Sequence, residues 1–395
     1  MKTDSCDILV VGGGIAGLIA SSAVARAGYK TICIEPRVPI TQGHDPEADT
    51  RTTAFLTKSL DILERAGLGP EFIQSGTPLQ KMRIADISKA PTVTREFDSA
   101  DIDQPYFGLN FPNWHIRAKA LDALEACHNA QFITGAALTD LTLRQDAAVA
   151  RLSNGATVQA KLIIGADGRH SAVARLAKIA MRPYEFGQSA LTFAVTHDIP
   201  HENISTEIHR SGGPFTLVPL PDLDNRPRSA VVWMDDHAAT HARKDLNVSE
   251  FEQQATDRSG HLFGPLTLCS SRQTWPILSQ LAQSLSARRV ALIAEAAHVM
   301  PPIGAQGLNT SLADVGAILD VLGTVSDPGD PAALRRYQNM RWPDMAARMA
   351  GVSALNHASQ IGAPVLQQMR RFGLEMFHDV PLIRRGLMHL GLGAR

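Results

Sequence analysis

Residues Asp7–Glu35 read DILVVGGGIAGLIASSAVARAGYKTICIE, and this stretch decides the fold. It opens with a short β-branched apolar run that predicts a buried strand. The run leads directly into Gly12-Gly-Gly-Ile-Ala-Gly17, a G-x-G-x-x-G pattern, and a helical stretch follows from Leu18 to Ala27. Gly28 predicts a helix C-cap, and residues 30–34 predict a second strand that ends at Glu35. Together they predict a βαβ unit that binds a dinucleotide.

Each glycine of the motif has a physical task. Gly12 permits the tight turn out of the strand, Gly14 lets a pyrophosphate approach the backbone, and Gly17 lets the helix pack closely on the strand. The helix N-terminus carries about half a positive charge and faces the phosphates. Glu35 can accept hydrogen bonds from both hydroxyls of the adenosine ribose. The motif alone does not distinguish NAD from FAD.

The composition excludes several classes of protein. A chain of 395 residues suits two domains, and 44% hydrophobic residues can fill a sizeable core. A net charge of -1 and 5% aromatic residues argue against a nucleic-acid binder. The apolar start lacks a basic leader and is interrupted by glycines, and no apolar run reaches the ~20 residues of a membrane span. We therefore expect a soluble or peripheral protein.

The four cysteines do not suggest chemistry. Cys6, Cys33, Cys127 and Cys269 form no C-x-x-C pair and do not lie at zinc-ligand spacing with histidine. We expect reduced, buried or semi-buried thiols in a reducing compartment, and no metal site.

Two further strand-to-helix turns carry polar residues. Residues 161–171 predict an apolar strand, the Asp167-Gly turn, and a helix from about Ala172. Residues 289–309 predict another apolar strand that ends at Glu295, a Pro-Pro corner, and a helix that begins near Gln306. The unpaired N–H groups at the start of that helix can point at an electron-rich ligand, such as the edge of a reduced flavin.

These patches resemble the class A flavoprotein monooxygenases, and within them the UbiH/UbiF type of ubiquinone-biosynthesis hydroxylase. The segments 184–190, 213–220 and 231–233 look like the sheet domain of that group, and Tyr337-x-x-x-Arg341-x-x-Asp344 looks like its tail. The resemblance covers nearly the whole chain. It implies an α/β fold in which a Rossmann-like FAD-binding domain is interleaved with a mixed or antiparallel β-sheet substrate domain, followed by C-terminal helices.

The resemblance also implies roles for particular residues. Arg51 and Arg117 would reach the FAD, with a surface ion pair as the alternative for each; Asp167 would brace the cofactor, and Glu295 would bind the ribitol. The expected cofactor contacts are Gly12, Gly14, Ile15, Ala16, Gly17, Glu35, Arg51, Arg117, Asp167, Glu295, Pro302, Gln306, Gly307, Leu308 and Asn309. No catalytic residue is assigned, because the flavin performs the chemistry.

The chain departs from the group at two places. Ala294-Glu295 stands where the group has Gly-Asp, and Gly304-Ala305 stands where it has Ala-Gly. Glutamate extends the carboxylate by one methylene. Ala305 cannot adopt a positive φ as cheaply as glycine, although Gly304 can relieve the turn. His298, at the corner between them, is interpreted as structural rather than as a base.

The implied reaction uses FAD, NAD(P)H and O2. NAD(P)H reduces the flavin, O2 adds at C4a, and the hydroperoxide passes its hydroxyl group to the ring of a polyprenyl phenol or quinol intermediate of ubiquinone biosynthesis. A free phenol has a pKa near 10, so the pocket must lower it or shuttle the proton, and no residue is assigned to that step. The sequence contains no second G-x-G-x-x-G motif, so we expect no separate NAD(P)H-binding domain. The ring position, the choice of NADH, NADPH or a protein donor, and the oligomeric state stay open.

Two other functions remain possible. One is a class A hydroxylase of a small soluble aromatic, and the other is a non-catalytic FAD-binding scaffold of a quinone-biosynthesis complex, motivated by the residues at 294, 295 and 305. Trp233 and Phe215 are interpreted as sheet core rather than substrate contacts.

The predicted domains are discontinuous. Residues 1–75, 100–182 and 275–325 form the FAD-binding domain, residues 76–99 and 183–274 the substrate domain, and residues 332–395 a helical segment. Apolar and basic residues alternate at helical spacing over 369–390. They predict peripheral attachment to the cytoplasmic side of the inner membrane or docking on other ubiquinone-biosynthesis proteins, and the alternative is packing on the FAD domain.

Overall fold

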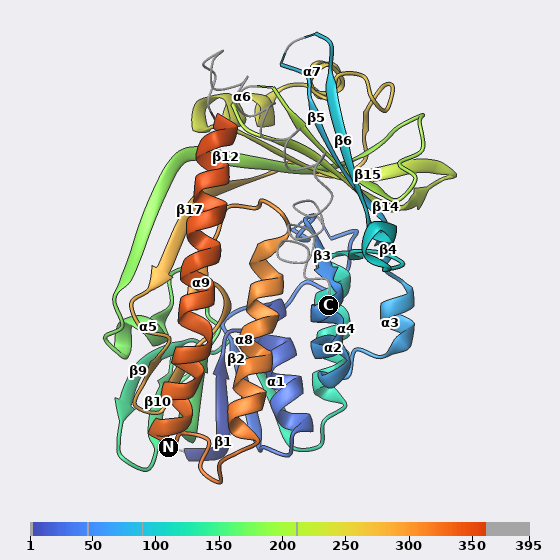
Figure 1. The fold of residues 1–395 in the computed structure, drawn as a ribbon. Coiled ribbons are helices and arrows are strands. Elements are labelled where there is room, and N and C mark those ends of the chain that lie inside the picture. The colour runs from blue at the N-terminus through green and yellow to red at the C-terminus, as the bar shows by residue number, and fades with distance from the viewer. Residues whose placement is uncertain (1–2, 46, 89, 211, 361–395) are drawn as a thin grey trace.

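The computed structural model describes residues 3–45, 47–88, 90–210 and 212–360, the side chains of 358–360 excepted. It contains two large sheets, one in the lower and one in the upper half of the view, with helices α1, α8 and α9 beside the lower one (Figure 1). This arrangement confirms the predicted α/β class. The part of the predicted C-terminal segment that is described is a single helix; residues 361–395 lie outside the described residues.

The first sheet is built on the predicted βαβ unit. Strand β1 (Thr3–Val11) pairs in parallel with β2 (Thr31–Glu35) and with β11 (Thr157–Gly165), and helix α1 (Ile15–Arg26) joins the first two. The sheet order is β18 (Ser286–Ala287), β19 (Val290–Leu292), β11, β1, β2 and β8 (Ala130–Thr134), with β10 (Ala148–Leu152) and β9 (Leu138–Leu143) continuing from β11. Because helices cover it, its central strands are apolar on both faces: Ile8, Leu9 and Val10 have no exposed surface.

The second sheet is mostly antiparallel. Its order is β20 (His298–Val299), β17 (Gln273–Ala282), β12 (Met181–Thr196), β15 (Arg226–Asp236), β14 (Phe215–Leu223), β13 (Ile204–His209), β5 (Lys81–Asp86) and β6 (Val93–Asp98), and β16 (Thr267–Leu268) also pairs with β12. Strand β17 lies wholly in this sheet, so the predicted boundary at residue 275 falls inside a strand.

One face of the second sheet has its own core. Phe215 and Trp233 are buried there with Phe251 of α7 (Val248–Arg258), as the interpretation of both residues as sheet core requires. The opposite face turns toward the first sheet. Aromatic pairs such as Phe215–Trp233, whose ring centroids lie 5.3 Å apart, make this core rigid.

A small third sheet and the remaining helices complete the fold. The small sheet, which the sequence did not predict, runs β3 (Thr52–Leu56), β7 (Gly108–Pro112), β4 (Thr77–Leu79). The helices and 3-10 turns not yet named are α2 (Thr57–Arg65), α3 (Pro70–Gln74), η1 (Ser99–Ile102), α4 (Asn113–Glu125), α5 (Ala172–Leu176), α6 (His237–Asp245), η2 (Ala294–Ala296), α8 (Gln306–Leu322) and α9 (Pro331–Gln360).

Helix α9 runs beside both large sheets (Figure 1). Near its start, the Tyr337 hydroxyl donates to the carbonyl of Leu292 in the first sheet, and near its end the Asn356 amide donates to Gln188 in the second sheet. The helix therefore ties the two sheets together. None of the helices among the described residues combines the length and apolar character needed to cross a bilayer.

Candidate functional site

A cavity of about 760 Å³ extends from the glycine-rich turn of the first sheet to the second sheet. Ligand pockets span roughly 300–1,000 Å³, so this one can hold a sizeable molecule. The first sheet contributes the ends of β1, β2 and β11, and the second sheet contributes residues of β5, β13, β14 and β15. The N-termini of α1 and α8 both line it, and the first N–H groups of a helix have no partner within the helix itself.

The glycine turn has the geometry that the motif predicts. Gly12 has φ +110°, and a Cβ there would lie 2.3 Å from the carbonyl oxygen of Ala166. A Cβ on Gly17 would lie 1.9 Å from the oxygen of Gly12, so helix and strand touch backbone to backbone. A Cβ on Gly14, the N-cap of α1, would meet nothing within 4 Å. The open space at Gly14 lies where an anion would meet the helix N-terminus.

Glu35 is held by the backbone of the same turn. Its Oε2 accepts a hydrogen bond from the N–H of Gly13 at 2.6 Å, and its Oε1 accepts one from the N–H of Arg37 at 3.2 Å. A Cβ on Gly13 would lie 2.7 Å from the Cβ of Glu35. Gly13, the middle glycine, had no predicted task. Its lack of a side chain lets the Glu35 carboxylate reach the turn. Glu35 still lines the cavity.

Asp167 caps the short helix α5. Its Oδ2 accepts from the N–H groups of Ala172 and Val173 at 2.7 and 3.1 Å, and its Oδ1 accepts from the Ser171 hydroxyl at 2.5 Å. Burial raises the pKa of the Asp167 carboxyl and outweighs these hydrogen bonds, which lower it. Asp167 therefore positions the turn as well as lining the cavity.

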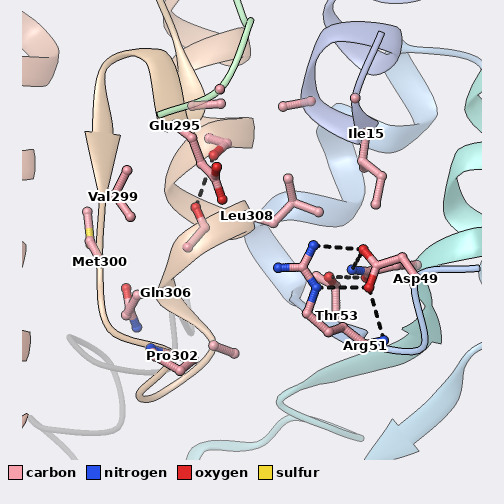
Figure 2. Close-up of a pocket in the computed structure, with 18 of the residues that line it drawn as sticks. Ile15, Asp49, Arg51, Thr53, Glu295, Val299, Met300, Pro302, Gln306 and Leu308 are labelled. Carbon is pink, nitrogen blue, oxygen red and sulfur yellow. Dashed lines mark hydrogen bonds and ion pairs between the residues drawn. The ribbon is translucent and has the colours of Figure 1, made fainter. Parts of the chain in front are cut away.

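Arg51 lies in a tight cluster on the opposite side of the cavity from the α8 start (Figure 2). Its Nε and Nη2 donate to the two carboxylate oxygens of Asp49, both at 2.8 Å, and its guanidinium stacks 3.7 Å from the centre of the Trp275 ring. Burial raises the pKa of Asp49, but the hydrogen bonds and charge of Arg51 and the amide of Asn113 lower it further, below its usual range. Arg51 is thus fixed from both sides.

Arg117 is placed less firmly. It lines the cavity from α4, and its Nη1 donates to the carbonyl of Ile40 at 3.3 Å. Arg51 forms an ion pair with Asp49, and both partners line the cavity, whereas Arg117 lines the cavity and donates to a backbone carbonyl.

The corner that carries Glu295 is anchored by a buried carboxylate that the sequence did not indicate. Asp314 of α8 has no exposed surface; it accepts from the Nε2 of His298 at 2.7 Å, the Nε of Arg341 at 2.8 Å and the N–H of Ala294 at 3.1 Å. Burial raises the pKa of Asp314, but His298 and Arg341 lower it more, so the carboxyl stays ionised. His298 is therefore structural, as interpreted, and Arg341 of the tail motif completes the cluster.

Glu295 itself is exposed within the cavity, where its carboxylate faces toward Arg51 and Leu308 (Figure 2). Its charge helps to raise the pKa of Arg51, together with the nearer Asp49 and against the effect of burial. Glu295 and the Arg51–Asp49 pair therefore lie on opposite walls of the cavity.

The Pro302–Asn309 segment forms the other side of the cavity. Pro302, Gln306, Gly307 and Leu308 line it, whereas Asn309 does not. The Asn309 side chain instead points behind the helix start, where its oxygen accepts from the N–H of Leu56 and its amide donates to the carbonyl of Ala54, at 2.9 and 2.7 Å. Asn309 thus fixes the start of α8 to β3.

Both alanines that replace glycines have a left-handed backbone. Ala294 and Ala305 each have φ 54°, and Gly304 has φ 65°. The neighbouring Gly304 therefore does not relieve Ala305, contrary to that expectation. A left-handed alanine costs about 1–2 kcal/mol, so the corner keeps its shape against a local strain.

The cavity matches what an FAD would require. It offers two helix N-termini, an open glycine at one of them, and fourteen of the fifteen predicted contact residues, all but Asn309. Groups of three or more histidine, cysteine or acidic side chains that could hold a metal ion are absent from the described residues.

The sequence profile of the FAD binding domain family matches residues 5–351. The chain belongs to this FAD-binding family. Among curated proteins it is 28% identical to the ubiquinone hydroxylase UbiL of Rhodospirillum rubrum, over 98% of this chain and 89% of that protein. It is 25% identical to the 3-demethoxyubiquinol 3-hydroxylase of Escherichia coli over the full length of both.

Solved structures show the same fold. The p-nitrophenol 4-monooxygenase PnpA of Pseudomonas putida superposes with a TM-score of 0.80 at 17% identity, covering all of both chains. The flavin-dependent monooxygenase PieE superposes with a TM-score of 0.72 at 19% identity, covering 99% of this chain and 73% of that one.

Proposed function

We propose that this protein is an FAD-dependent monooxygenase that hydroxylates the aromatic ring of a polyprenyl phenol or quinol intermediate of ubiquinone biosynthesis. The observation that carries the proposal is the single cavity that joins the glycine turn to the second sheet, in a chain that matches ubiquinone hydroxylases from end to end. A cofactor at the first sheet and a substrate at the second would meet inside it.

The predicted residues would hold the FAD along this cavity. The N-terminus of α1 at Gly14 would face the pyrophosphate, Glu35 the ribose, and Glu295 the ribitol. The start of α8, at residues 306–308, would lie against the flavin ring, where its N–H groups favour negative charge. When bound, the flavin takes electrons from NAD(P)H and, with O2, supplies the oxygen atom that is added to the ring.

The protein's own contribution is to position the reactants and to exclude water. Arg51, stacked on Trp275, would keep one side of the cofactor fixed. The apolar side chains of the second sheet would shield the reacting ring from solvent. Two measurements test the proposal: a flavin absorbance spectrum of the purified protein, and NAD(P)H consumption that depends on a phenolic substrate. Deletion of the gene followed by mass spectrometry should reveal an accumulated quinone precursor, and its absence would overturn the assignment to ubiquinone.

A non-catalytic FAD-binding scaffold is the second candidate. The left-handed Ala294 and Ala305 favour it, since both lie beside the expected flavin end. Flavin bound at full occupancy without substrate-dependent NAD(P)H consumption would support the scaffold. A class A hydroxylase of a small soluble aromatic would instead turn over free phenols faster than prenylated ones.

We also propose peripheral attachment to the inner membrane through residues 369–395, which lie outside the described residues. A polyprenylated substrate has to be drawn from a membrane, and basic amphipathic sequences bind anionic lipid surfaces. Flotation with liposomes tests this, because a variant that lacks 369–395 should no longer float with them.

A further inference from the structure

The wall that the second sheet presents to the cavity combines apolar and polar side chains, Lys81 among the polar ones. Met82, Val218 and Val232 supply the apolar surface. Set among them are Ser205, Glu207 and Thr216, the last two being directly paired across β13 and β14. Among the described residues of this sheet that line the cavity, Glu207 is the sole carboxylate. A charged acceptor set among apolar side chains is costly unless it meets a partner.

Glu207 already has one partner, His209, two residues along the same strand. The Nε2 of His209 lies 2.7 Å from the Oε1 of Glu207, and the two side chains are 11% and 21% exposed. Residues two apart on a strand point to the same face, so His209 lies beside Glu207 on the cavity side of the sheet. Nε2 donates to the carboxylate through Oε1.

The ring of His209 has a second, unused position. Its Nδ1 is buried and has no hydrogen-bond partner among the described residues. With Nε2 donating to Glu207, Nδ1 is the ring atom that can take up a proton. Of the two residues, Glu207 lines the cavity, so its carboxylate is the group that can meet a ligand there, with His209 behind it.

Neighbouring cations are engaged elsewhere. On β5, Lys81 pairs with Asp98 of β6 at 3.0 Å, and Arg83 pairs with Glu96 of β6 at 2.7 Å. Arg258 of α7 donates to the backbone carbonyls of Ile208 and Gly213, at 3.3 and 2.6 Å. Asp86 of β5 is paired in register with His209 and accepts from Ser88. The strand on the other side, β14, presents uncharged Thr216 to Glu207.

We propose that Glu207 recognises a ring hydroxyl of the substrate and takes its proton, and that His209 positions Glu207. The substrate O–H bond breaks, its electron pair stays on the substrate oxygen, and the proton passes to the carboxylate. The ring becomes more electron-rich as this happens, which is what attack on an electrophilic oxygen requires. The identity of the substrate rests on the proposed function; the recognition of a phenolic hydroxyl does not.

A binding experiment on the FAD-loaded protein tests the recognition step without turnover. The probes are 4-methylphenol, which stays protonated near neutral pH, and its methyl ether, 4-methylanisole, in which a methyl group replaces the hydroxyl proton. We expect the wild-type protein to bind the phenol at least about tenfold more tightly, the size of effect typical of a hydrogen bond to a charged acceptor. The substitution Glu207→Gln should remove this preference by weakening the phenol and leaving the ether unchanged. Glu185→Gln, an isosteric change at an exposed carboxylate of β12, should keep the preference.

The positioning role of His209 needs its own variants. His209→Gln retains an N–H near the position of Nε2 and should preserve most of the preference, whereas His209→Leu should lose it. A purely structural role would instead destabilise both variants and leave the ratio of the two affinities unchanged. In turnover, Glu207→Gln should lower kcat more than it changes KM for NAD(P)H.

The outcomes separate this inference from the proposed function. Equal binding of the two probes by the wild-type protein, or an unchanged preference in Glu207→Gln, would overturn the role of Glu207 whatever the enzyme does. A preserved preference for the phenol in a protein that hydroxylates no substrate would leave the role standing and overturn the monooxygenase.

Discussion

Replacing Asp314 by asparagine should destabilise the protein far more than its small change in shape suggests. All three partners of this carboxylate are donors: Ala294 N–H, His298 Nε2 and Arg341 Nε. One carboxylate oxygen accepts from Ala294 and His298, and the other accepts from Arg341. An amide has only one oxygen, and an NH2 group takes the place of the other. The NH2 group must therefore face a donor whichever way the side chain turns. Breaking a buried ionic cluster in this way costs about 3–5 kcal/mol.

The assay is thermal unfolding at pH 7 with Asp320→Asn as the control. With an unfolding entropy of about 2.1 cal/mol/K per residue, that loss lowers Tm by roughly 4–6 °C if the chain unfolds as a unit. Asp320 is 60% exposed and lies 3.6 Å from Arg65, so its neutralisation should change stability by less than about 0.5 kcal/mol.

The pKa shift of Asp314 determines how its contribution to stability changes with pH. Burial raises the pKa of Asp314, but His298 and Arg341 lower it more, so the folded-state pKa lies below the unfolded one. Such a group contributes its full stability above the unfolded pKa, near 3.9, and loses it as the pH falls through the folded value. The gap in Tm between wild type and Asp314→Asn should thus be constant from pH 7 to about pH 5 and shrink below about pH 4. A Tm within about 1 °C of wild type at pH 7 would refute the reasoning.

Four further substitutions test the cofactor side of the cavity. Gly12→Ala brings a Cβ to 2.3 Å from the oxygen of Ala166, so this variant should yield little folded protein. Gly14→Ala meets no atom within 4 Å, so it should keep the wild-type Tm but lose FAD affinity, measured by fluorescence titration. Equal Tm values for the two variants would contradict this. Ala305→Gly relieves a residue at φ 54°, so it should raise the free energy of unfolding by up to about 1 kcal/mol and raise Tm with it. A lower Tm would show that the alanine is not strained. Glu295→Ala removes a carboxylate that faces the cavity and should weaken FAD binding by about tenfold, the value of one charge-assisted hydrogen bond, while Glu202→Ala serves as the unchanged control.

The strand-turn-helix elements could be predicted because their signals are local. Gly17 is required by a contact with Gly12 within the turn, and the start of α8 at Gln306 follows from the prolines before it. The contact of Gly12 with Ala166 comes from a distant strand, but the motif itself marks the glycine. The interpretation of Phe215 and Trp233 as sheet core likewise agrees with the structure.

The contacts that depend on distant pairing could not be predicted. Nothing in the sequence around Asp314 indicates that it meets His298 and Arg341, and Asp49 gives no sign that Arg51 will stack on Trp275. Asn309 was expected at the cofactor because it follows residues that line the cavity, but one further step around the helix turns its side chain to β3. Glu207 lies in an ordinary strand, and only the register of β13 against β14 brings it to the cavity.

The order of the strands also governs how the chain folds as it is synthesised. Strand β11 must hold β1 on one side and β19 on the other, yet Val290–Leu292 is made long after Thr157–Gly165. Until then β10 covers only the first half of that edge of β11, and Ile163–Gly165 have no strand beside them there. Nearly all of the second sheet emerges from the ribosome before the first is complete. Contacts over such sequence separations form slowly and leave sticky edges exposed. The newly made chain can therefore complete its first sheet only after Leu292 has been synthesised, and its exposed strand edges make it most prone to aggregation before that point.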